Sequence, residues 1–159
     1  MKLQTKIKID FWDFIKNGKF DCIKLGQTKE WILNNFPNPD NFSADFLSSK
    51  YNIWTYGNIE FHFNKSSELF LIYSDYLDKL DGGDNLELNK WIFETFPKLN
   101  LIYVITKLNE QEIDYCKSSE QFCVRLTTKN GVELGFEKDN IVSDPNQLHM
   151  TYFGLRDKE

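Results

Sequence analysis

The sequence has few of the residues with which enzymes usually carry out chemistry. It contains three cysteines, two histidines and two arginines among 159 residues. An odd number of widely spaced cysteines does not fit a disulfide scaffold and is typical of a reducing compartment. Without C-x-x-C spacing or an H-x-x-x-H pair, the sequence predicts no zinc site, and it has no glycine-rich phosphate-binding loop. We therefore expect no metal, no cofactor and no catalytic activity.

Long hydrophobic runs are also absent. No segment approaches the roughly 18 apolar residues that a membrane-spanning helix needs. Residues 2–9 alternate between apolar and polar side chains, which predicts a half-buried strand and not the apolar stretch of a signal peptide. The net charge of −5 and the scarcity of arginine argue against binding nucleic acid through its phosphates. These absences favour a cytoplasmic protein without a membrane or nucleic-acid partner.

Aromatic residues are abundant, with 14 Phe, 7 Tyr and 4 Trp making up 16% of the chain. Large rings bury much apolar area, so we expect most of them in the core. Aromatic residues are also enriched at interfaces between proteins. The composition is therefore compatible with an aromatic core and with a few rings on a binding surface.

A repeated pattern is the strongest structural signal in the sequence. Residues 57–63 (GNIEFHF) and 130–136 (NGVELGF) align at a constant offset, with Ile59, Glu60, Phe61 and Phe63 matching Val132, Glu133, Leu134 and Phe136. A strand-like run precedes and follows each copy, and an amphipathic helical stretch lies further upstream, at 28–36 and at 100–108. Each copy therefore predicts a helix followed by an antiparallel meander.

This pattern predicts an α+β fold with two tandem modules, whose helices lie on one face of an antiparallel sheet. The chain is short enough for a single domain, residues 1–159, built of modules at about 1–80 and 86–155. Residues 77–85, which include Gly82 and Gly83, read as the connector. A further helix is expected from about residue 85 to 96. The sequence does not decide whether one sheet runs through both modules, nor the oligomeric state.

Acidic residues gather around the connector, since residues 68–94 hold seven acids against Lys79 and Lys90. Their spacing does not match the calcium-binding loop of an EF-hand. A solvated loop is one interpretation, and a surface for a basic protein partner is the other. Under the second interpretation the candidate partner-binding residues are Asp75, Tyr76, Asp78, Asp81, Asp84 and Glu87, together with the outward-facing Glu60 and His62 of the strand at 59–64.

Two resemblances accompany this pattern. The glycine turn and helix at 25–36, the break Phe36-Pro-Asn-Pro-Asp40 and the aromatic hairpin from Trp54 to Gly57 resemble beta-lactamase-inhibitor-type repeats. Residues 54–63 (WTYGNIEFHF) are similar to a W-x-Y-G-D-I-E-F-H-F motif of uncharacterised bacterial proteins, whose second half carries a G-V-x-L-x-F strand like residues 131–136. Both resemblances imply helices on an antiparallel sheet that grips another protein. The motif itself is expected to stabilise the hairpin and the core.

The second resemblance implies an immunity protein of polymorphic or contact-dependent growth-inhibition toxins. Such a protein would bind its cognate toxin domain and occlude the active site, with a nuclease as one candidate because an acidic surface suits a basic cleft. One alternative is a scaffold or homodimer whose sheet edge is buried by its own copy. The other is a small ligand-binding domain or enzyme with a pocket between the modules. In that case His62, His149 and Cys123 would converge there with carboxylates.

Overall fold

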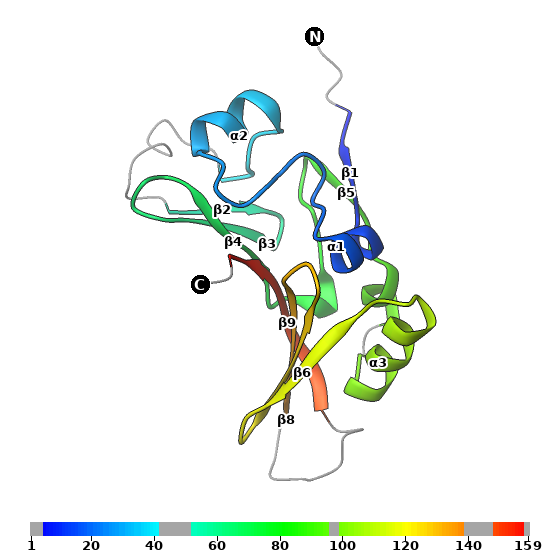
Figure 1. Ribbon diagram of the computed structural model, residues 1–159. Coiled ribbons are helices and arrows are strands. Elements are labelled where there is room, and N and C mark those ends of the chain that lie inside the picture. Colours follow the sequence, from blue (N-terminus) through cyan, green and yellow to red (C-terminus); the bar gives the residue numbers. More distant parts are fainter. Residues whose placement is uncertain (1–4, 42–51, 96–98, 139–147, 158–159) are drawn as a thin grey trace.

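A computed structural model describes residues 5–41, 52–95, 99–138 and 148–157 (Figure 1). The fold is α+β, as predicted, and its main layer is a seven-stranded antiparallel sheet with the order β2-β3-β4-β9-β8-β7-β6. The strands are β2 (Ile53–Tyr56), β3 (Ile59–Phe63), β4 (Leu69–Ser74), β6 (Tyr115–Ser119), β7 (Cys123–Thr128), β8 (Val132–Lys138) and β9 (Leu148–Arg156).

The helices are α1 (Phe11–Asn17), α2 (Lys29–Asn35) and α3 (Leu101–Glu110), with the 3-10 turns η1 (Leu77–Lys79) and η2 (Trp91–Thr95). Each α-helix begins after a side chain that accepts a hydrogen bond from a backbone N–H in the first turn. These caps are Asp10, Thr28 and Asn100, with N···O distances of 3.0, 3.1 and 2.8 Å. Capping of this kind satisfies donors that the helix leaves unpaired. The helices expected at 28–36 and 100–108 are confirmed as α2 and α3.

The core lies between the helices and one face of the sheet. Figure 1 shows α1 and α3 on the same side of the sheet, in agreement with the predicted layering. Four buried rings join these layers at the centre: Phe153 of β9 meets Phe11 and Phe14 of α1 and Phe93 of η2, with centroids 5.2, 5.7 and 5.2 Å away. The aromatic residues therefore fill much of the core, as expected.

One continuous sheet runs through both halves of the chain, because β4 pairs with β9. The two matching segments of the sequence become β3 and β8, and both lie inside the sheet with a neighbour on each side. The halves are otherwise unequal, because the second contributes β6 as an additional strand at the edge. The repeat therefore marks corresponding strands, but the structure does not establish two equivalent modules.

The helix expected at 85–96 is wrong. Residues Leu86–Asn89 form strand β5, which pairs in parallel with β1 (Ile7–Asp10), and η2 follows. Leu86 is buried and Leu88 is partly buried, both on the alternating positions of a strand. The partner β1 is about 80 residues earlier in the chain, so the local spacing of apolar residues could not reveal this pairing.

The predicted connector is tied to the turn between β2 and β3. Asn58 exchanges two hydrogen bonds with Asp81, one from its backbone N–H to the Asp81 carbonyl (3.1 Å) and one from the Asp81 N–H to its side-chain oxygen (2.8 Å). The carboxylate of Asp40 accepts bonds from the N–H groups of Gly57 and Asp84. The Pro39-Asp40 break and the Tyr56-Gly57 turn therefore have a structural role, because their hydrogen bonds attach the hairpin to the connector.

Replacing Gly57 by alanine should lower the free energy of unfolding by about 3 kcal/mol. Gly57 has a positive φ of 60°, and an added Cβ would lie 2.2 Å from the carbonyl oxygen of Asp81. Both the backbone strain and the overlap destabilise the folded state. Urea denaturation measures the change. Gly26→Ala is the matched control, because its φ is also positive but nothing lies within 4 Å of its added Cβ; equal losses in the two variants would contradict the role of the close contact.

Candidate functional site

The face of the sheet opposite the helices, which we call the open face, has a row of directly paired residues that crosses all seven strands. Pairing places in this row Thr55, Glu60, Tyr73, Gly154, Glu133, Thr127 and Cys116. Successive side chains of a strand point to opposite faces of a sheet. Along each strand, every second residue therefore points to the open face, and the residues between them point into the core. The open face is therefore a rigid surface whose composition is set by every second residue of the strands.

Two stacked tyrosines occupy the middle of the open face. The rings of Tyr73 on β4 and Tyr152 on β9 lie 5.7 Å apart at an interplanar angle of 30°. Gly135 makes room for the Tyr152 ring, because a Cβ at this position would lie 1.9 Å from it. The pair thus sits at the junction of the two halves of the sheet.

A histidine and a glutamate lie on one side of the tyrosine pair. His62 and Glu60 of β3 are joined by a hydrogen bond of 2.7 Å between Nε2 and Oε2. The imidazole ring also meets Phe70 and Tyr73 edge-on, with both centroids 6.2 Å away. These contacts hold His62 in one orientation, which extends the aromatic surface towards β3.

Arg125 of β7 lies on the other side of the pair. Its Nε donates to the hydroxyl of Tyr152 at 3.2 Å and lies 3.9 Å from the carboxylate of Glu133. The hydrogen bond to Tyr152, and then the charge of Glu133, raise the pKa of Arg125, so the guanidinium stays charged. Arg125 therefore fixes the position of the Tyr152 ring and partly neutralises its acidic neighbours.

Carboxylates surround the tyrosines. Partial burial raises the pKa of Tyr73, and the negative charges of Asp75, Glu60 and Glu137 raise it further. The phenol is accordingly protonated at neutral pH and presents a hydroxyl group, not an anion. The open face thus combines an uncharged aromatic centre with a rim that carries more acidic than basic groups, namely Glu60, Asp75, Glu133 and Glu137 against Arg125 and Arg156.

Part of the predicted partner-binding set belongs to this surface. Glu60 and His62 lie on the open face, and Asp75 follows the last residue of β4. Tyr76 is 54% exposed and comes next in the chain. Asp75 and Asp78 also line a shallow depression of about 230 Å³ with Leu77, Met150 and Thr151. The first half of the acidic segment is therefore continuous with the sheet.

The second half of the acidic segment lies elsewhere. Asp81 is exposed, but its carboxylate accepts the N–H of Gly83 and its backbone is bonded to the β2–β3 turn. Asp84 is bonded to Asp40. Glu87 lies on β5, opposite Lys8 of β1, in the separate two-stranded sheet. The predicted acids thus do not share one surface, because the connector bends around the hairpin turn.

The residues named for the alternative pocket lie on three different strands of the sheet. His149 and Cys123 are both cross-strand neighbours of Glu137, whereas His62 pairs with Ile53 and Leu71. Partial burial, together with the charge of Glu137, raises the pKa of the Cys123 thiol, which disfavours the reactive thiolate. Within the described residues, no three His, Cys, Asp or Glu side chains are grouped so that they could hold a metal ion.

The described parts of the chain contain no helix that is both long and apolar enough to cross a membrane.

Comparison with protein-family models, with curated proteins and with solved structures gives no match for this chain. The resemblance to toxin immunity proteins therefore remains a prediction from its motifs. Sequence reasoning singled out Glu60, His62 and Asp75 but missed Tyr73, Tyr152 and Arg125. The alternation along each strand marks these as outward-facing, but only the pairing of β4 with β9 brings them together.

Proposed function

We propose that this chain is a protein inhibitor of the immunity type, which binds the catalytic domain of a toxin and blocks access to its active site. The observation that carries the proposal is the open face, where a stacked pair of tyrosines is surrounded by carboxylates. Tyrosine is among the residues that most often dominate the binding energy of an interface.

Such a face suits a basic partner. Glu60, Asp75, Glu133 and Glu137 would attract a positively charged groove over a distance of about one Debye length, roughly 8 Å at physiological salt, and so accelerate association. The tyrosines would then make the close contact. A nuclease whose groove binds the phosphates of nucleic acid has the required charge, and occupation of that groove by the sheet would exclude its substrate.

The rigidity of the open face supports tight binding. Tyr152 is held by Arg125 and by its packing on Gly135, and His62 is held by Glu60. Side chains that are already fixed lose less conformational entropy when a partner docks. The immunity function requires such an affinity, because residual free toxin would still act on the cell.

The test is a neutralisation assay with the protein encoded immediately upstream of this chain. Its C-terminal domain is expressed in bacteria alone and together with this chain. We expect growth arrest by the domain alone, normal growth on co-expression, and a stoichiometric complex that weakens with salt. Growth arrest that this chain does not relieve, or a harmless neighbour together with a small molecule retained by the purified chain, would refute the proposal.

A further inference from the structure

The two edge strands of the seven-stranded sheet, β2 and β6, differ in whether their outward-facing backbone groups are hydrogen-bonded. At the β2 edge, the backbone N–H of Asp40 donates to the carbonyl of Thr55 at 2.8 Å. The side chain of Asn41 acts like another strand, since it accepts from the N–H of Thr55 (3.2 Å) and donates to the carbonyl of Ile53 (3.3 Å). Outward-facing backbone groups of β2 are thus already bonded.

The β6 edge has no such cover among the described residues, where β6 pairs only with β7. Two hydrogen bonds, from Lys129 N–H to the Asp114 carbonyl and from Glu120 N–H to the Cys123 carbonyl, show which residues of this hairpin direct their backbone groups to the neighbouring strand. Even-numbered residues from 114 to 120 consequently bond to β7. The N–H and C=O groups of Tyr115, Lys117 and Ser119 point outward, away from the sheet.

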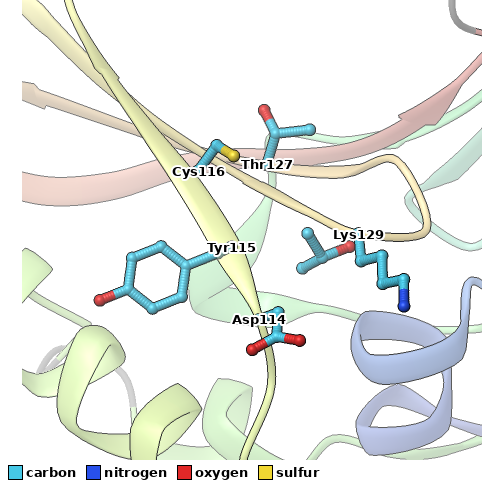
Figure 2. A pocket seen from close by; sticks show the side chains of 6 residues that line it. Asp114, Tyr115, Cys116, Thr127 and Lys129 are labelled. Carbon is cyan, nitrogen blue, oxygen red and sulfur yellow. The ribbon is translucent and has the colours of Figure 1, made fainter.

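Each end of this edge offers a contact for a side chain. Next to Tyr115, a depression of about 320 Å³ is lined by β6 and by the end of β7, and Figure 2 shows the Tyr115 ring and the Lys129 side chain directed to opposite sides of it. At the other end, Phe122 in the β6–β7 turn is 58% exposed. In Figure 1 the hairpin of β6 and β7 projects away from the helices.

The positive charge of Lys117 on β6 indicates which kind of strand could pair with this edge. Lys117 is exposed and is the one charged side chain between Tyr115 and Ser119. A second copy paired about a two-fold axis at residue 117 would place two ammonium groups opposite each other, which is destabilising. A carboxylate at the same position of another strand would form a favourable cross-strand pair. Lysine on an edge strand also discourages unspecific pairing with apolar strands.

We propose that β6 is a site for strand addition, at which an extended segment of a partner protein pairs with the free edge and places a carboxylate opposite Lys117. The backbone groups of Tyr115, Lys117 and Ser119 supply the main-chain bonds, as in other complexes formed by adding a strand to a sheet. The depression beside Tyr115 receives an apolar side chain of the segment. This site borders the open face, with which its depression shares Cys116 and Thr127, and it does not depend on the immunity function.

The test uses phage-displayed random peptides of roughly twelve residues, enough to cover the strand at about 3.3 Å per residue. The full chain is the bait, with reductant present because Cys116 is exposed. We expect enrichment of alternating β-branched sequences with Asp or Glu at a fixed position. On binding of such a peptide, hydrogen exchange should slow at the amides of Tyr115, Lys117 and Ser119.

Substitutions at one position separate the backbone from the charge. Lys117→Pro removes an outward N–H that β7 does not use, so the fold is kept, and peptide affinity should fall at least about tenfold. Lys117→Thr keeps the N–H and should cost only the charge pair, about threefold. Circular dichroism verifies that both variants are folded.

Three results would overturn the proposal. The first is a selection that enriches no peptide. The second is a set of binders that Lys117→Pro leaves unaffected. The third is a dimer of the free protein, seen by light scattering, that Lys117→Pro converts to a monomer, because the edge would then belong to a second copy.

Discussion

Replacing Phe153 by alanine is expected to lower the free energy of unfolding by about 4 kcal/mol. The side chain is fully buried on β9, the strand through which the two halves of the sheet are joined. Its ring contacts Phe11, Phe14 and Phe93, so its removal takes away apolar burial and leaves a cavity between the sheet, α1 and η2. Guanidinium denaturation followed by circular dichroism measures the loss, which corresponds to roughly 10 °C in Tm.

Phe122→Ala is the matched control for this experiment. It removes the same number of atoms from a ring that is 58% exposed in a turn, and its effect should remain below about 0.5 kcal/mol. A loss below about 1 kcal/mol for Phe153→Ala would mean that the rings around it repack and that the core has another centre.

The second large effect is expected at the open face. Reversing two charges in the variant Glu60→Lys/Asp75→Lys should weaken the proposed complex with a toxin domain about 100-fold, mostly through slower association. Both carboxylates are close enough to Tyr73 to affect its pKa, so their replacement changes the charge next to the tyrosine pair. Surface plasmon resonance at several salt concentrations gives the rates, and the salt dependence of association should flatten in the variant.

Two further variants test the position of the interface. Tyr152→Ala should cost roughly 2 kcal/mol of binding. Tyr152→Phe keeps the stacked ring and loses only the hydrogen bond from Arg125, so it should weaken binding less. Glu87→Lys serves as the charge control, because Glu87 lies on β5 and not on the main sheet. If Glu87→Lys weakened binding and the Glu60 and Asp75 reversals did not, the interface would lie on the β1–β5 side.

The local features of the chain could be predicted because their causes are local. Asp10 and Thr28 cap helices within three residues of themselves, and Gly18 ends α1 through its positive φ. The Asn130-Gly131 pair lies in the hairpin turn between β7 and β8, where Gly131 has a positive φ of 90°. Each of these features depends on neighbours in the chain, so the sequence contains the whole reason for it.

Errors arose where a distant segment decided the structure. Residues 86–89 carry apolar side chains that fit a helical stripe, yet hydrogen bonds to β1 turn them into a strand. Likewise, the acids from Asp75 to Glu87 are regularly spaced in the chain, but the bonds of Asp81 to Asn58 and of Asp84 to Asp40 distribute them over different surfaces. Tertiary hydrogen bonds override local spacing in both cases.

The sequence by itself determined the α+β class, the alternation of the strands, the helix caps and the position of the matching segments β3 and β8. Only the tertiary structure decided that β4 and β9 join the halves into one sheet and that Tyr73 stacks on Tyr152 beside Arg125. It also decided that the β2 edge is covered, whereas no described residue covers the β6 edge. The physical reason is that helix caps and turns act within a few residues, whereas strand pairing brings together residues that are tens of positions apart.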